Sequence, residues 1–294
     1  MNIDGAATLG FAKFDLKTAV EHLSRLGFKF VELSYMGWHS KHLPYKQIDP
    51  TAVLTLLSEY GMTPISMNIS NHRSMSSKDH LTASDRPDFH DYTNPLHVEE
   101  AVNQARWYLE SAKAMNINIV TMSTAPRVFG DRWNVVMNGA CMAFRRIAEI
   151  AAELDISVNL EVPHLFQITD SLEHVKAVFD EISHPNVGAT VDSSHWGIVG
   201  YDPFEFFGWL GSRLRHVHLR DSEGPDTKDR KQTLELTAGK GTVDFALFRQ
   251  ALQQVGYSGR VTLDFEYKID DLAVIESEYR QGLAYLETCG WCLA

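Results

Sequence analysis

Short apolar runs alternate along the chain with longer stretches whose apolar residues recur at helical spacing. The short runs predict strands at residues 7–11, 30–34, 63–69, 117–123, 156–162, 187–192, 214–219 and 260–266. The longer stretches predict helices near residues 15–26, 49–60, 96–115, 131–154, 170–183, 202–211, 243–255 and 270–288. Strands that are each followed by a helix predict a parallel α/β fold. The length of 294 residues is usual for a (β/α)8 TIM barrel.

Local signals support these helices and a single domain over residues 1–294. Asp15 precedes the first helical stretch and Gly27 follows it, while Asp49 and Pro50 begin the second. No Pro/Gly/Ser-rich linker divides the chain. A doubly wound sheet is the competing architecture, but residues 8–13 lack the Gly-rich loop of a dinucleotide site. The barrel is therefore the favoured fold.

Four of the predicted strands in the second half end on a residue that can bind a metal ion. In a parallel barrel such ends converge on one face. The proposed ligands are Glu161, Asp192, His218 and Glu266. Asp264 lies two residues before Glu266 on the same side, and the later position favours Glu266. Three carboxylates and an imidazole suit one divalent ion, Mn2+ foremost, with Mg2+, Co2+ or Zn2+ as alternatives.

Composition narrows the classes of partner. The formal net charge of -11 argues against non-specific nucleic-acid binding. No apolar run is long enough to cross a bilayer, and the first residues do not have the pattern of a signal peptide, so we expect a cytoplasmic protein. The spacing of Cys289 and Cys292 resembles a metal or redox pair, but no second pair accompanies it, which favours a structural reading.

The order of motifs resembles the sugar phosphate isomerase/epimerase superfamily of xylose-isomerase-like barrels. It consists of Asn-Leu-Glu, Val-Asp-Ser-Ser-His-Trp-Gly, His-Val-His-Leu-Arg-Asp, and Gly-Lys-Gly-Thr-Val-Asp-Phe followed by a strand with an acidic end. The resemblance implies a (β/α)8 barrel with a Mn2+, Mg2+ or Co2+ ion on Glu161, Asp192, His218 and Glu266. It also implies a homo-oligomer, a dimer or a tetramer.

The resemblance further implies a metal-dependent sugar isomerase or epimerase that moves a proton next to a carbonyl through a metal-stabilised enediolate. Glu161 and Glu266 match the two carboxylates that exchange the proton from opposite faces. His195 matches a position that contacts substrate oxygens, and a histidine there could also shuttle protons. The further candidates for binding a small sugar or polyol are Arg220, His164 and Gln167.

Two departures from ketose 3-epimerases keep other readings open. Gln167 stands where those enzymes carry an acidic residue, and Gly224 stands where they carry an arginine. A lyase of the same fold, either a dehydratase or an enzyme that cleaves a keto-glycoside by β-elimination, would use the same chemistry. A metal-holding binding subunit and a nuclease are further alternatives, and the charge disfavours the nuclease. Two long connections, 70–95 and 220–242, are expected to cover a substrate.

Overall fold

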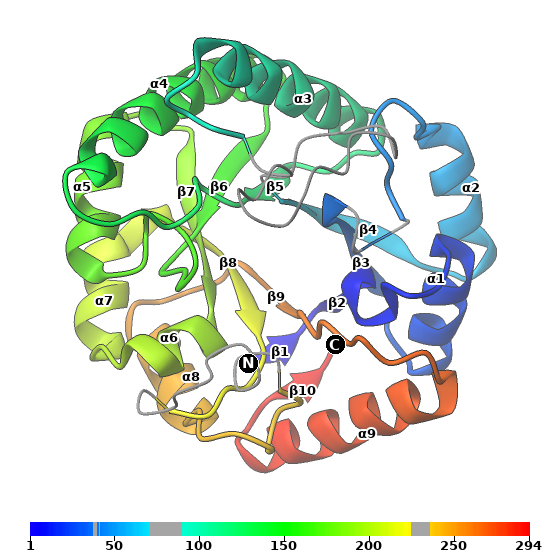
Figure 1. Ribbon diagram of the computed structural model, residues 1–294. Coiled ribbons are helices and arrows are strands. Elements are labelled where there is room, and N and C mark those ends of the chain that lie inside the picture. The colour runs from blue at the N-terminus through cyan, green and yellow to red at the C-terminus, as the bar shows by residue number, and fades with distance from the viewer. Residues whose placement is uncertain (38–39, 41, 71–89, 225–235) are drawn as a thin grey trace.

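The computed structural model describes the whole chain except residues 38, 39, 41, 71–89 and 225–235. Eight parallel strands close into a barrel in the order β2 to β9, and helices surround it (Figure 1). The strands of the barrel are β2 Gly5–Ala7, β3 Phe30–Tyr35, β4 Thr63–Ile69, β5 Ile119–Met122, β6 Ser157–Glu161, β7 Val187–Asp192, β8 Leu214–Leu219 and β9 Arg260–Leu263. The predicted single-domain TIM barrel is confirmed, since β2 pairs with both β3 and β9.

The predicted helices also form, with boundaries that shift by one or two residues. Asp15 and Asp49 cap α1 and α2 as expected, through the backbone N–H groups of Thr18 and Thr51. The helices are α1 Leu16–Arg25, α2 Pro50–Glu59, α3 Pro95–Ala114, α4 Arg132–Glu153, α5 Leu172–Ile182, α6 Ser193–Val199, α7 Pro203–Leu210, α8 Phe245–Gln254 and α9 Leu272–Thr288. Of these, only α6 lies outside the predicted stretches.

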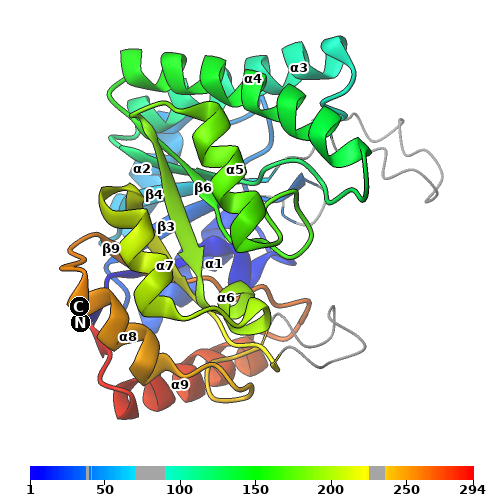
Figure 2. The same ribbon diagram turned by 90° about the vertical axis from the view of Figure 1, so that its left-hand side faces the viewer.

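The two ends of the chain meet beside the barrel. The markers of the N- and C-termini lie next to each other (Figure 2), and strand β1, Asn2–Ile3, pairs in parallel with β10, Cys292–Leu293 (Figure 1). Cys292 is thus part of this small sheet, and all three cysteines are free. Among the described residues, no helix has both the length and the apolar character needed to span a bilayer.

Two predicted strand boundaries are wrong in ways that matter for the site. The first strand ends at Ala7, and residues Thr8–Phe11 form a 3-10 helix. The Thr8 hydroxyl accepts the backbone N–H of Ser34, and Gly10 packs so close to the Tyr279 ring that no Cβ would fit. The last strand ends at Leu263, so residues 264–266 follow it instead of completing it. Residues 71–89 of the first long connection and residues 225–235 of the second lie outside the described residues, so their expected role in covering a substrate stays a prediction.

Candidate metal centre

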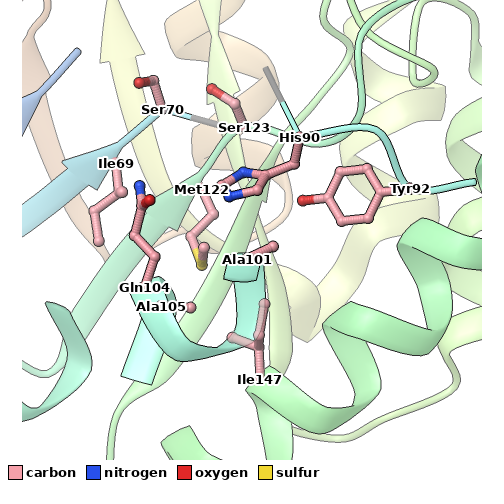
Figure 3. A pocket seen from close by; sticks show the side chains of 10 residues that line it. All are labelled: Ile69, Ser70, His90, Tyr92, Ala101, Gln104, Ala105, Met122, Ser123 and Ile147. Carbon is pink, nitrogen blue, oxygen red and sulfur yellow. The ribbon is translucent and has the colours of Figure 1, made fainter. Parts of the chain in front are cut away.

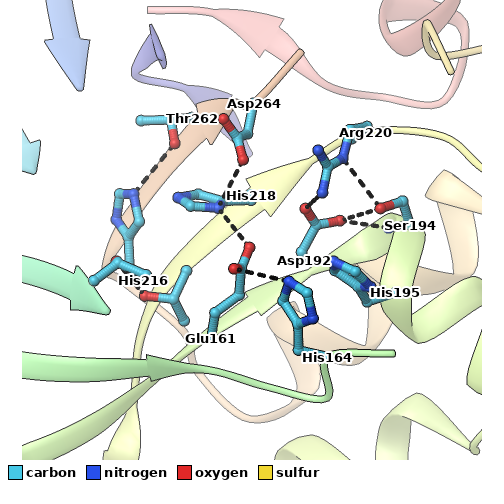
Figure 4. Close-up of polar contacts among 12 residues, drawn as sticks. Glu161, His164, Asp192, Ser194, His195, His216, His218, Arg220, Thr262 and Asp264 are labelled. Atoms are coloured by element: carbon cyan, nitrogen blue, oxygen red, sulfur yellow. Dashed lines mark hydrogen bonds and ion pairs between the residues drawn. The ribbon is translucent and has the colours of Figure 1, made fainter. Parts of the chain in front are cut away.

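The ends of β6, β7, β8 and β9 bring four potential ligands together inside the barrel. They are Glu161, Asp192, His218 and Asp264, all buried, and one ligand atom from each lies within 4.8 Å of the others (Figure 4). In the strand register, Asp192 pairs with His218 and His218 pairs with Thr262. Asp264 lies two residues beyond Thr262 and therefore points to the same side. The carboxylates at the ends of β6, β7 and β9 therefore surround the imidazole of His218 at the end of β8.

The spacing of these groups fits a divalent cation. His218 Nδ1 lies 3.5 Å from Glu161 Oε1 and 3.4 Å from Asp264 Oδ2. Ligand atoms around an ion with bonds of about 2.1 Å are separated by roughly 3 Å when adjacent and roughly 4 Å when opposite. His218 Nδ1 and both Asp264 oxygens are buried, with no hydrogen-bond partner among the described residues. Buried polar atoms of this kind are costly unless a partner or an ion satisfies them.

The pKa of Asp264 also indicates that the cluster could hold a divalent cation. Burial, reinforced by the charges of Glu32 and Asp192, raises the pKa of Asp264 to about 7. His218 responds in the opposite sense, because Glu32 and Asp264 raise the pKa of its imidazole in spite of burial. The cluster therefore holds more negative charge than its own cations balance. A divalent ion would relieve this imbalance.

Asp192 is held quite differently, by a complete set of hydrogen bonds. Its Oδ1 accepts the N–H and the hydroxyl of Ser194 at 2.7 and 2.6 Å, which caps helix α6. Its Oδ2 accepts Nη2 of Arg220 at 2.7 Å. Although burial opposes ionisation, the Arg220 guanidinium and nearby imidazoles hold the pKa of Asp192 at about 2. Asp192 therefore both begins a helix and contributes an ionised carboxylate.

Glu266 does not join the cluster, so the preference for the later acidic position is not supported by the geometry. Its Oε1 accepts Nη1 of Arg220 at 2.6 Å, and its side chain is 23% exposed. Strand β9 has already ended at Leu263, three residues before Glu266. Asp264 occupies the inward position that we expected for Glu266. Arg220, expected to bind substrate, is itself buried between Asp192 and Glu266.

The rings of His164 and His195 lie beside the carboxylates, with centroids 4.0 Å apart and planes tilted by 35°. Burial and the neighbouring imidazole lower the pKa of His164 to about 3, and burial with Arg220 lowers the pKa of His195 to about 3. Each Nδ1 accepts a backbone N–H, from Phe166 and Leu165 respectively. A neutral imidazole that accepts at Nδ1 carries its proton on Nε2. Both rings therefore present N–H donors.

Gln167 braces two loops of the barrel mouth. Its Oε1 accepts both the backbone N–H and the hydroxyl of Thr124, the latter at 2.8 Å. Gln167 also forms an isolated antiparallel bridge with Pro126. The carbonyl oxygen of the side chain is thus already engaged between the loop after β5 and the loop after β6. This geometry favours a structural role over the substrate contact that we expected.

Glu32 is a buried acidic residue that sequence reasoning missed. It lies in β3 next to both histidines of β8, with Oε1 3.0 Å from His218 Nε2 and Oε2 3.0 Å from His216 Nε2. Burial opposes its ionisation, but the two imidazoles hold the pKa of Glu32 well below its usual range. The available signal was a lone carboxylate within the apolar run Phe30–Tyr35.

A small cavity between β4, β5 and helices α3 and α4 is separate from this centre (Figure 3). Its volume of about 10 Å3 accommodates at most one water molecule, so it cannot take a sugar. Its lining residues are Ile69, Ser70, His90, Tyr92, Ala101, Gln104, Ala105, Met122, Ser123 and Ile147.

The fold and the site together define a TIM-barrel protein with a buried candidate metal centre at the carboxyl ends of its strands. Residues 20–289 match the family model of the xylose isomerase-like TIM barrel, so this chain belongs to that family. The chain is similar to a ketose 3-epimerase of Arthrobacter globiformis, with 24% identity over 85% of this chain and 77% of the relative.

Other similarities are consistent with the family. An inosose dehydratase of Geobacillus thermodenitrificans is 22% identical over 54% of this chain and 56% of that protein. The crystal structure of a D-allulose 3-epimerase from Methylomonas sp. superimposes with a TM-score of 0.72 at 20% identity, over 98% of both chains. At this identity the structural similarity supports the fold.

Proposed function

We propose that the protein is a divalent-metal-dependent sugar isomerase or epimerase that moves a proton at a carbon next to a carbonyl, through an enediolate. The similarity to ketose 3-epimerases supports the class of substrate. The cluster of Glu161, Asp192, His218 and Asp264 supports the metal requirement, with Mn2+ as the first ion to test. A bound divalent ion would supply a Lewis acid for neighbouring oxygens of the sugar.

The observation that carries this proposal is that the two oxygens of the Glu161 carboxylate face different partners. Oε1 faces His218 Nδ1 at 3.5 Å, whereas Oε2 faces His164 Nε2 at 3.6 Å. One oxygen thus lies with the metal ligands and the other lies outside them. The side chain retains 7% exposure, whereas that of Asp264 has 1%. Glu161 is therefore the carboxylate placed to take a proton from a substrate.

The remaining polar groups fit roles in binding and orientation. The Nε2–H groups of His164 and His195 can donate to sugar oxygens without carrying a charge, because both rings are neutral. Arg220 fixes Asp192 and Glu266 in place through its guanidinium. We therefore assign His195 and His164 to substrate binding, Glu161 to proton transfer, and Arg220 with Glu266 to positioning.

Isotope exchange tests this proposal directly. The purified protein is incubated with Mn2+ and a panel of ketopentoses and ketohexoses in heavy water. Deuterium at the carbon beside the carbonyl, detected by proton NMR, is the expected result. The matched control is Glu161→Gln, which keeps the side-chain volume and should lose the exchange. Absence of exchange for every ketose, with the ion shown to be bound, would contradict the proposal.

A lyase is the second candidate, and the asymmetry of the acidic residues favours it. Inversion at a carbon requires proton delivery to the face opposite the base, whereas β-elimination requires one base and a donor to the leaving group. Glu161 is the accessible base, and the imidazole N–H groups lie beside it. The similarity to an inosose dehydratase supports this reading. The protein would be established as a lyase if ultraviolet absorbance shows that it forms an unsaturated ketone from a 3-keto-sugar or a keto-cyclitol.

A further inference from the structure

A second buried cluster lies directly behind the candidate metal centre. Glu32 in β3 contacts His216 and His218 in β8, and all three side chains are fully buried. Ser66 in β4 donates its hydroxyl to Glu32 Oε2 at 2.7 Å. None of these residues except His218 belongs to the proposed ligand set. The cluster thus joins the early half of the barrel to the strand that carries the histidine ligand.

The two ring nitrogens of His218 face different partners. Nδ1 lies 3.5 Å from Glu161 and 3.4 Å from Asp264, on the side of the candidate metal centre. Nε2 lies 3.0 Å from Glu32 Oε1, on the opposite side. An imidazole that binds a metal through one nitrogen carries its proton on the other, and a carboxylate commonly accepts a hydrogen bond from that N–H. The arrangement around His218 has this form.

We propose that Glu32 is a positioning residue that keeps the proton of His218 on Nε2 and so presents Nδ1 as a metal ligand. His216 is held by the other oxygen of the same carboxylate, and its ring stands at 88° to that of His218, which limits rotation of the ligand. This inference rests on the proposed metal centre. It extends that centre to a residue on the far side of the barrel that contacts neither ion nor substrate.

A second ion between Glu32, His216 and His218 is the alternative. The distances favour direct ion pairs without an intervening ion, because each imidazole Nε2 has its own Glu32 oxygen at 3.0 Å and Ser66 already donates a hydrogen bond to one of these oxygens. Thr262 lies 3.2 Å from His216 Nε2 and adds a further neutral partner. The two arrangements predict different stoichiometries, one ion or two ions per chain.

The test is a metal titration of the full-length protein with the Glu32→Gln variant, which keeps the volume and removes the charge. Mn2+ affinity is measured by electron paramagnetic resonance of the free ion, and the Co2+ absorption spectrum reports on ligand geometry. We expect one ion per chain in the wild type and an affinity that is about 10–100-fold lower in Glu32→Gln. The Co2+ spectrum of the variant should also change in position or intensity.

Ser66→Ala is the matched control, because it removes a hydrogen bond to Glu32 and leaves the carboxylate in place. Its affinity should stay within about threefold of the wild type. If Glu32→Gln does not fold in chelator, judged by circular dichroism, Glu32→Asp replaces it and should show an intermediate loss with the charge retained but displaced.

The possible contrary results separate the two proposals. Wild-type affinity and spectrum in Glu32→Gln, an equal loss in Ser66→Ala, or two ions per chain would overturn the role of Glu32 alone. A wild-type protein that binds no Mn2+ or Co2+ would overturn the metal centre and this inference with it.

Discussion

Asp192 and Asp264 are the same residue type at the ends of two strands of one barrel, yet their surroundings are opposite. Asp192 receives three hydrogen bonds from Ser194 and Arg220, and the pKa of its carboxyl lies at about 2. Asp264 has none from the described residues, and burial raises its pKa to about 7. The fold therefore satisfies the Asp192 carboxylate with hydrogen bonds, whereas the described residues donate none to the Asp264 carboxylate, as a carboxylate reserved for a cation would require.

The largest expected effect concerns Glu161, whose side chain is buried but slightly more accessible than that of Asp264, at 7% against 1%. Glu161→Gln should lower kcat about 1,000-fold with saturating metal, since the variant lacks the carboxylate that we propose as the general base. The measurement is the rate of deuterium incorporation into the responsive ketose.

Glu266→Gln serves as the comparison for that experiment. Its carboxylate is engaged by Arg220 and lies outside the ligand cluster, so kcat should fall by no more than about tenfold. If kcat falls as far in Glu266→Gln as in Glu161→Gln, Glu266 is a second base, and the assignment of its expected place in the cluster to Asp264 is wrong.

The next effect tests the satisfied aspartate. Asp192→Ala should lower the free energy of unfolding by about 3–5 kcal/mol, because it leaves Arg220 buried with one partner fewer and removes the cap of α6. Urea unfolding in chelator measures this loss without a contribution from metal. A change of less than about 1 kcal/mol would show that the hydrogen bonds of Asp192 contribute little to the fold.

Asp264→Asn should behave in the reverse manner. In chelator its free energy of unfolding should stay within about 1 kcal/mol of the wild type or rise, since the variant removes a buried carboxylate that accepts no hydrogen bond from the described residues. Its Mn2+ affinity should fall by at least about 100-fold, because a proposed direct ligand loses its charge. Strong destabilisation in chelator together with normal metal binding would reverse the comparison between the two aspartates.

The smallest expected effect concerns Gln167 and tests whether its side chain holds two loops together or binds substrate. Gln167→Ala should cost about 1–3 kcal/mol of stability, because the buried Thr124 N–H loses its acceptor. Gln167→Glu keeps an acceptor and should remain within about 1 kcal/mol of the wild type in urea unfolding. If Gln167→Ala instead raises KM with unchanged stability, Gln167 binds substrate.

Much of the architecture follows from local patterning. Apolar periodicity predicted the barrel strands and eight of the helices, since hydrophobic spacing and caps such as Asp15 act within a few residues. Helix α6 was missed because it has only seven residues, Ser193–Val199. The end of the first strand was missed because the Thr8 side-chain hydroxyl, instead of a backbone carbonyl, accepts the N–H of Ser34 in the neighbouring strand.

The sequence by itself determined the barrel and three members of the candidate centre, Glu161, Asp192 and His218, because each stands at the end of a strongly apolar run. Only the tertiary structure shows that Asp264, and not Glu266, lies in the cluster. Both lie on the same side of the chain, and the choice depends on where β9 leaves the sheet relative to β8. Glu32 likewise became meaningful only when closure of the barrel placed it against His218, far away in sequence. Such contacts depend on the packing of distant strands, which local patterns do not encode.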